Sequence, residues 1–344
     1  FNEITKSAIK NALKETRELD MNLVDAQECR RILDRLFGFL ISKKLWTNIK
    51  GGLSAGRVQS PAVKILVDRE KERTQFIKNE YWSLDGEFKT KNENINSNMI
   101  SIKNKKVASG SDFNKKTGQV KGKNIVVLNQ NDAEKLSQNL KKNNWTVASV
   151  IKKPATQNPY PPFITSTLQQ EGIRKLYLSS QQVMMVAQKL YENGHITYMR
   201  TDSVNLSNEA INASRKEIKK LYGTEFIPDK PRVYKSKAKN IQEAHEAIRP
   251  AGSSFNHPDT LKSTLSDQEY KLYNMIWKRT IASQMKAARL EKTTVQISDK
   301  EHVFEAKGKV IIFSGFLKAY VESSDNSSAT LDNMEQILPE VKVG

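Results

Sequence analysis

The sequence has a single cysteine, Cys29, among 344 residues. One cysteine cannot form an intrachain disulfide, so a disulfide-held fold is excluded, and the composition suits a reducing compartment. A zinc site built from several cysteines of this chain is excluded as well. No apolar run reaches the roughly 18 residues that a membrane-spanning helix needs. The basic residues are also spread along the chain instead of gathering in one cluster beside a membrane.

The N-terminus lacks the basic and apolar regions of a signal peptide. The chain begins at Phe1 instead of a methionine, and it stops at Gly344 directly after a short apolar and basic stretch. We therefore expect a fragment of a longer protein.

Positive charge is abundant. Lys and Arg number 56 against 38 Asp and Glu, which gives a formal net charge of +18. A globular chain this basic is expected to bind a polyanion, because each neutralised phosphate releases condensed counterions. The composition thus predicts a nucleic-acid partner, with a charged surface that serves only solubility as the alternative.

Patterning divides the chain into helical and β-rich stretches, and its length predicts two or three domains. Helical periodicity and caps predict helices over residues 3–17, from an N-cap at Asp25 to about 50, 60–78 with proline at the first position, 132–142, 163–177, 179–193, 207–222 and 266–290. Ser179 and Gln182 form a capping box at the start of the helix over 179–193, and Gly194 follows that helix in the position of a C′ glycine. Alternation predicts strands over 81–88, 125–128, 145–151, 293–297, 302–306 and 309–312, with polar loop sequence up to about 101 and a proline-rich linker over 154–162.

The simplest topology inserts the second helical unit into a β domain whose two halves meet in space. We predict a helical domain at 1–78, a discontinuous β-rich domain at 79–153 and 291–344, and an inserted helical, winged-helix-like domain at 154–290. The fold class is multidomain α and β.

Residues 194–203 read Gly-His-Ile-Thr-Tyr-Met-Arg-Thr-Asp-Ser and carry the first candidate site. In an extended segment Tyr198 and Arg200 share a face. Attack on phosphorus needs the phenol deprotonated, and a neighbouring guanidinium favours that form while binding phosphate oxygens. The alternative is a tyrosine packed at a winged-helix edge beside a surface arginine, which suits most isolated triplets of this kind.

A second candidate lies in the helix after Asp25. Arg31 and Arg35 share a helix face, with Arg30 close by, so that several guanidiniums can contact successive phosphates. Phe39 and Trp46 follow as stacking surfaces for unpaired bases. The alternative is a solvated face on which Asp34 balances the arginines.

The third candidate is the glycine-rich run after Gly51. It leads into a helix N-terminus, where free N–H groups bind anions, but it lacks the Gly-Lys-Ser/Thr ending of a P-loop. The binding residues expected in it are Ser54, Ala55, Gly56, Arg57, Val58 and Gln59.

His245 lies in the run Gln-Glu-Ala-His-Glu-Ala-Ile-Arg-Pro. The run resembles half of a zinc-binding helix, but Arg249 stands where the second histidine would be, which excludes a zinc protease. A histidine among basic residues can bind phosphate, and a helix-surface histidine is the alternative.

Together these runs resemble the type IA DNA topoisomerases, in particular bacterial topoisomerase I. The matching motifs are Ser54-Ala-Gly-Arg57-Val-Gln59-Ser, Pro159-Tyr-Pro-Pro-Phe163 with the following Thr165-Ser-Thr-Leu-Gln-Gln-Glu171, Ile196-Thr-Tyr198-Met-Arg200-Thr-Asp202-Ser, and Glu243-Ala-His245-Glu-Ala-Ile-Arg249-Pro. They occur in the order of the family and span nearly the whole chain.

The resemblance implies that Tyr198 attacks one DNA strand to form a 5′-phosphotyrosine link, so that another strand passes before resealing. Negative supercoils would then relax without ATP. It further implies that Arg200 stabilises the scissile phosphate, that His245 supports DNA binding, and that Arg30, Arg31, Asp34, Phe39, Trp46 and residues 54–59 form a single-strand groove. Phe39 stands where the family often has tyrosine.

The resemblance also implies parts that this sequence does not contain. The family's Toprim domain, with its acidic Mg²⁺ ligands, would precede Phe1, and a downstream segment would complete the strand-binding domain. We expect Mg²⁺ to serve the parent enzyme with no ligand from this chain. We also expect the 344 residues alone not to relax a supercoiled plasmid. The expected partner is single-stranded DNA, the expected state a monomer, and the expected location the cytoplasm, at the nucleoid.

Several alternatives remain. Tyrosine recombinases and type IB topoisomerases use Tyr, Arg and His as well, but their tyrosine is borne on a helix and they form a 3′ link. A non-catalytic DNA-binding module is the alternative of a different class. Topoisomerase III and reverse gyrase share the tyrosine motif, whereas Met199 and the run around His245 are more similar to bacterial topoisomerase I.

Overall fold

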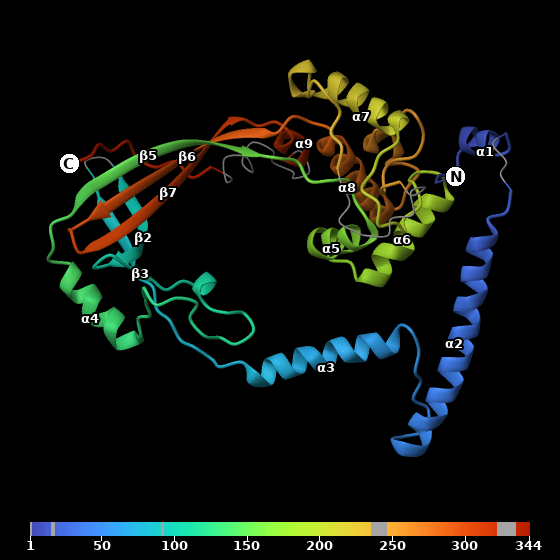
Figure 1. Ribbon diagram of the computed structural model, residues 1–344. Coiled ribbons are helices and arrows are strands. Elements are labelled where there is room, and N and C mark those ends of the chain that lie inside the picture. The colour runs from blue at the N-terminus through green and yellow to red at the C-terminus, as the bar shows by residue number, and fades with distance from the viewer. Residues whose placement is uncertain (1, 15–17, 91–92, 235–245, 322–334) are drawn as a thin grey trace. The chain divides into compact units, whose positions relative to one another are not determined.

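The computed structural model describes residues 2–14, 18–90, 93–234, 246–321 and 335–344 (Figure 1). The chain separates into two compact units. Unit 1 comprises Phe1–Thr16, Val150–Val295 and Lys307–Val341, and unit 2 comprises Arg17–Ser149, Gln296–Ala306 and Lys342–Gly344. No helix among the described residues is long and apolar enough to cross a membrane.

Unit 1 is built on a cluster of helices around one apolar core. The helices around it are α5 (Thr165–Leu176), α6 (Ser180–Glu192), α7 (Asn208–Leu221), α8 (Asp267–Ser283) and α9 (Leu317–Val321), with short 3₁₀ turns η2 (Thr224–Phe226) and η3 (Pro258–Leu261). Helix α1 (Lys6–Ala12) belongs to the same unit but has no buried residue. Helix α8 contributes the largest buried side chains, Tyr273 and Trp277, which pack with Leu168 of α5 and Leu190 of α6. This core fixes the helices that carry the candidate tyrosine.

The predicted caps of unit 1 are confirmed. Ser179 Oγ accepts from Gln182 N, and Gln182 Oε1 accepts from Ser179 N, which completes the capping box of α6. Gly194 follows the helix with a φ of 72°, the left-handed conformation that favours glycine. Ser207, which the prediction placed inside the helix, is the N-cap of α7.

Helix α8 ends at Ser283, earlier than the predicted 290. The residues from Ala288 onward belong to strand β6, in which Ala288, Leu290, Val295 and Ile297 are buried. The sequence-based prediction extended the helix too far because alanine and leucine at its end suit either structure.

The strands form one sheet in the order β4-β3-β2-β7-β6-β5, with β1 paired to β2. Their bounds are β1 (Asp85–Lys89), β2 (Asn94–Ile102), β3 (Lys105–Val107), β4 (Ile125–Val126), β5 (Thr146–Gln157), β6 (Ala288–Ser298) and β7 (His302–Phe313). Figure 1 shows β5, β6 and β7 running side by side as long strands. The turn η1 (Gly110–Asp112) and helix α4 (Gln130–Leu140) complete this β-rich part.

Three sequence-based predictions for the sheet were wrong. The polar stretch before residue 101 is strand β2, because its apolar residues alternate: Ile95 and Met99 are buried and the asparagines between them are exposed. Strand β5 runs through Pro154, which an edge strand tolerates. Strand β7 is continuous across Gly308, where a Cβ would come within 2.9 Å of Gln336 O.

Two helices of unit 2 hold the predicted strand-binding residues. Helix α2 (Met21–Asn48) is capped by Asp20 instead of Asp25, and α3 (Gln59–Gln75) begins before Pro61, which is therefore at its third position. The predicted apolar stripe of α2 is exposed among the described residues; Ile32, for example, is 58% exposed. No described segment covers this face.

Candidate active site and nucleic-acid surface

The segment after α6 presents Tyr198 and Arg200 on one exposed face. Tyr198 is 37% exposed and Met199 only 1%, and the alternation continues with Arg200 exposed and Thr201 buried. Among the described residues the segment forms one β-bridge, from Ile196 to Pro250, so it is extended without belonging to the sheet. Met199 is anchored in the apolar core, which turns its two neighbours outward.

Thr165, the first residue of α5, holds this segment from one side. Its Oγ1 donates to Met199 O at 2.8 Å and accepts from Thr201 N at 2.9 Å, and its backbone N donates to Thr201 O at 3.0 Å. The carbonyl and amide groups that flank Arg200 are thereby fixed to a helix N-terminus. Sequence reasoning included Thr165 in a motif but gave it no role.

Thr197 holds the segment from the other side. Its N donates to Arg249 O at 2.9 Å, while its Oγ1 accepts from Arg249 N at 2.9 Å and donates to Ala247 O at 2.8 Å. Tyr198 N donates to Asn2 O at 2.8 Å. The backbone around Tyr198 is thus hydrogen-bonded to three separate segments of unit 1.

Arg249 explains why this arrangement is rigid. Its side chain is only 4% exposed and forms a bidentate pair with Glu246 at 2.8 and 2.9 Å. Nη1 donates to Glu3 Oε2 at 2.9 Å and to Pro250 O at 2.8 Å. Buried charges need such partners, so we assign Glu246 and Arg249 to the support of the segment. His245, the predicted DNA-binding member of the same run, lies outside the described residues.

A shallow pocket of about 380 Å³ lies beside Arg200. It is lined by the first turn of α5 (Ile164, Thr165 and Ser166) and by Arg200, Thr201 and Asp202. Helix N-termini attract anions through their free N–H groups. An arginine beside such a terminus suits a phosphate group, although Asp202 adds a negative charge to the same rim.

The ring of Tyr198 packs against a second aromatic side chain. Tyr191 of α6 packs edge-on against the Tyr198 ring, with 5.2 Å between centroids. Within the described residues the Tyr198 hydroxyl has no hydrogen-bond partner, so it is available to a ligand. His195 lies at the start of the segment and its ring stands 6.3 Å from that of Tyr273. Burial lowers the pKa of His195, with Glu269 acting in the opposite direction.

In unit 2, Arg30, Arg31 and Arg35 are exposed on α2, as predicted from their spacing. The hydrogen-bond partner of Asp34 is Arg57 of the glycine-rich loop, whose Nη2 donates to Asp34 Oδ2 at 2.8 Å and whose Nε donates to Asp34 Oδ1 at 2.5 Å. Arg30 acts on the same carboxylate through its charge. This contact with Arg57 lowers the pKa of Asp34. The second and third candidate sites of the sequence are therefore neighbours, which spacing alone could not show.

The same surface exposes two aromatic rings, Phe39 at 69% and Trp46 at 49%. Trp46 Nε1 donates to Leu53 O, which ties α2 to the start of the loop. Ala55 is buried and its N donates to Ser42 Oγ at 3.0 Å. Gly56, Val58 and Gln59 continue the loop into α3; Val58 is 77% exposed, and Gln59 Nε2 donates to Ser54 Oγ at 3.3 Å.

The part of the chain that the structure describes contains no group of three or more His, Cys, Asp or Glu side chains placed to hold a metal ion. The described residues therefore do not provide a ligand set for Mg²⁺.

Comparison with known proteins identifies relatives along the whole chain. The sequence profile of a family described as DNA topoisomerase matches residues 18–344. The DNA topoisomerase 1 of Synechococcus elongatus is 48% identical over 345 residues, which cover 100% of this chain and 39% of that protein. That of Streptomyces coelicolor is 48% identical over 356 residues, with 100% and 37% covered.

A solved structure of a topoisomerase is also similar to this chain. The full-length topoisomerase I of Thermotoga maritima superimposes with a TM-score of 0.75 and 33% identity, over 100% of this chain and 52% of that one. Its similarity confirms the predicted fold class of helical and β-rich parts. The chain spans less than two fifths of the length of the two curated relatives.

Proposed function

Because the chain belongs to the DNA topoisomerase family, we propose that it carries the DNA-cleaving tyrosine, Tyr198, of a bacterial type IA enzyme. The observation that carries this proposal is the shared exposed face of Tyr198 and Arg200 on a backbone that is fixed on both sides. The 48% identity to proteins named DNA topoisomerase 1 favours that branch over topoisomerase III and reverse gyrase.

The proposed reaction is a transesterification. The Tyr198 oxygen attacks the phosphorus, the bond from phosphorus to the 3′ oxygen breaks, and a 5′-phosphotyrosine link forms. The phenol loses its proton and the 3′ oxygen gains one. One phosphodiester bond replaces another, so resealing by the reverse reaction needs no ATP. Passage of the second strand through the gap would relax negative supercoils.

Arg200 has the role of binding the non-bridging phosphate oxygens as negative charge develops on them. A guanidinium suits this role because its paired N–H donors match two oxygens at once. The neighbouring pocket at the α5 N-terminus offers space for the phosphate on the same side. His245 is proposed to support DNA binding near this place.

Unit 2 is proposed to hold the unpaired strand. Arg30, Arg31 and Arg35 would contact phosphates, and Phe39 and Trp46 would stack on bases. The loop of residues 54–59 and the Asp34–Arg57 pair lie next to these groups. We further propose domain limits of 1–78, 79–153 with 291–344, and 154–290, a monomeric state, a location at the nucleoid and a parent enzyme that needs Mg²⁺.

The proposal is tested with the full-length protein on an end-labelled single-stranded oligonucleotide, trapped by denaturant. We expect a covalent adduct with the wild type and with Tyr191→Phe, the matched control from the adjacent ring. Tyr198→Phe should give none. An adduct that persists in Tyr198→Phe would refute the nucleophile, and intact DNA binding without any wild-type adduct would favour a non-catalytic module. Plasmid relaxation by the 344 residues alone would contradict the expected inactivity.

A further inference from the structure

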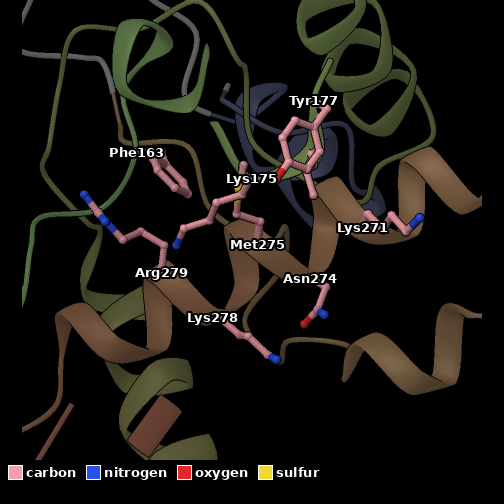
Figure 2. Close-up of a pocket in the computed structure, with 9 residues that line it drawn as sticks. Phe163, Lys175, Tyr177, Lys271, Asn274, Met275, Lys278 and Arg279 are labelled. Carbon is pink, nitrogen blue, oxygen red and sulfur yellow. The ribbon is translucent and has the colours of Figure 1, made fainter. Parts of the chain in front are cut away.

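A second pocket in unit 1, distinct from the one beside Arg200, lies between the C-terminal end of α5 and one face of α8 (Figure 2). Its volume is about 410 Å³, within the range of small-ligand pockets. The lining residues are Phe163, Lys175, Leu176, Tyr177, Lys271, Asn274, Met275, Lys278 and Arg279. None of these is acidic.

The charge of the pocket is positive. Lys271 and Lys278 are seven positions apart on α8, so they lie on one helix face about 10 Å apart along its axis. Lys175 adds a third ammonium from α5. Two carboxylates stand beside the pocket: Asp267 contacts Lys271 Nζ at 2.7 Å, and Glu171 contacts Lys175 Nζ at 3.0 Å. Three lysines and Arg279 line the pocket without an acidic residue among the lining, which favours an anionic ligand.

The apolar wall is rigid. Arg279 is only 7% exposed, its Nε donates to Pro161 O at 2.7 Å, and its guanidinium lies 4.8 Å from the centre of the buried Phe163 ring. Together with Met275 and Leu176, Phe163 gives the pocket an apolar surface. In Figure 2, Lys175 extends between Phe163 and Met275, and Lys271 and Lys278 stand farther out.

Tyr177 is the most unusual member. It ends α5 in the left-handed conformation, with φ 56° and ψ 28°, where glycine or asparagine is usual. The residue is 89% exposed. Residues in sparsely populated backbone conformations cluster at ligand-binding and active sites, so Tyr177 draws attention to this pocket. Aromatic rings interleaved with cations are what unpaired bases and their phosphates bind.

We propose that this pocket binds a segment of single-stranded DNA, with a base stacked on Tyr177 and phosphates on Lys271 and Lys278. The site is separate from the one that attacks DNA and from the α2 surface. It shares with the proposed function only the assumption that the partner is single-stranded DNA, and it does not depend on the identity of the nucleophile.

The test is photo-cross-linking of the full-length protein to an oligothymidylate that carries iodouracil, with the modified peptide identified by mass spectrometry. We expect a cross-link at Tyr177 that falls about tenfold when Lys271 and Lys278 are both changed to alanine. Tyr177→Gly should abolish it, and glycine suits this backbone, so the fold is retained. Tyr177→Phe should keep it within about twofold, as stacking persists. Lys219→Ala on α7 is the matched control and should have no effect.

A wild-type chain without a cross-link at Tyr177, or a yield unchanged in the double-lysine variant, would overturn the proposal. The proposal would also be overturned, in favour of an acidic protein partner, if Tyr177 gave no cross-link to the oligonucleotide while polyglutamate competed with the oligonucleotide for the protein. Tyr198→Phe is predicted to abolish the covalent adduct and to leave this cross-link in place. The two proposals therefore fail in distinguishable ways.

Discussion

Glu3 and Arg249 form a buried ion pair, with 2.9 Å between Glu3 Oε2 and Arg249 Nη1. The same Glu3 oxygen accepts from Gly252 N at 2.8 Å. The residue before Glu3 accepts the hydrogen bond of Tyr198 N. The first residues of the chain are therefore bound both to the run that follows His245 and to the segment that bears the tyrosine.

Replacing Arg249 with methionine should destabilise unit 1 strongly. Two carboxylates, Glu3 and Glu246, would be left buried without their cation, and breaking a buried pair in this way costs about 3–5 kcal/mol. Urea unfolding followed by circular dichroism measures the loss. Arg69→Met is the control, since Arg69 pairs with Glu72 on the exposed surface of α3 and should change the free energy of unfolding by less than about 1 kcal/mol. Equal effects of the two variants would contradict the structural role of Arg249.

Thr165 is predicted to be a positioning residue. Thr165→Val removes the hydroxyl that bonds to Met199 O and Thr201 N, which frees the backbone on both sides of Arg200. The rate of adduct formation should fall about tenfold to a hundredfold, because small misplacements are costly in attack geometry. The Kd for the oligonucleotide should change less than about twofold, and Thr165→Ser should restore the rate. A valine variant with weaker binding and an unchanged rate would refute this role.

Arg200→Ala tests the phosphate contact. Loss of a charged donor at the reacting phosphate should slow adduct formation about 10²–10³-fold. Arg200 is exposed and its backbone is held by Thr165, so the melting temperature should hardly change. Single-turnover cleavage of the labelled oligonucleotide gives the rate, and a rate within about twofold of wild type would exclude Arg200 from the reaction.

Asp34→Asn should strengthen single-strand binding. The change removes a negative charge from a surface proposed to meet phosphates and weakens the hold on Arg57, which is then available for another anion. The salt dependence should steepen by about 0.7 in the slope of log K against log salt for one additional contact. Arg31→Ala should flatten it by a similar amount. Fluorescence anisotropy at several salt concentrations measures this slope. An unchanged slope in Arg31→Ala would favour the interpretation that α2 presents only a solvated charged face.

The stability of unit 1 should depend on pH through His195. Burial lowers the pKa of His195 below its usual value of about 6.5, so the unfolded chain binds more protons in the interval between the two values. The free energy of unfolding should therefore decrease as the pH falls from about 6.5 through the lower folded pKa. Comparing melting temperatures at about pH 7.5 and about pH 5.5, we expect a smaller drop in His195→Gln than in wild type. An equal drop would assign the pH dependence to other groups.

Local signals in the sequence predicted much of unit 1. The capping box of Ser179 and the glycine at 194 are short-range features, and the structure confirms both. The alternation from Ile196 onward likewise placed Tyr198 and Arg200 on one face, as the burial of Met199 and Thr201 confirms.

Long-range features were not predictable in this way. One of the two buried partners of Arg249 is Glu3, 246 positions away, and neither spacing nor composition links the two. The partner of Asp34 is Arg57, not a neighbour on its own helix. Strand β2 was missed because asparagines dominate its composition, and the alternation of buried and exposed residues becomes clear only once the strand is paired within the sheet. The apolar stripe of α2 was predicted correctly from its periodicity, but periodicity does not reveal that the stripe is exposed, because it carries no information on which segment covers it.

The backbone contacts of Thr197, Tyr198, Met199 and Thr201 have a consequence for entropy. Fixing one residue's backbone costs about 1–2 kcal/mol of conformational free energy. Here that cost is met during folding, when residues 2, 165 and 247–249 close around the segment. Only the side-chain torsions of Tyr198 are then left to be ordered when a ligand binds. The conformational free energy of orienting the phenol is therefore lost mostly on folding, and it reduces the free energy of binding very little.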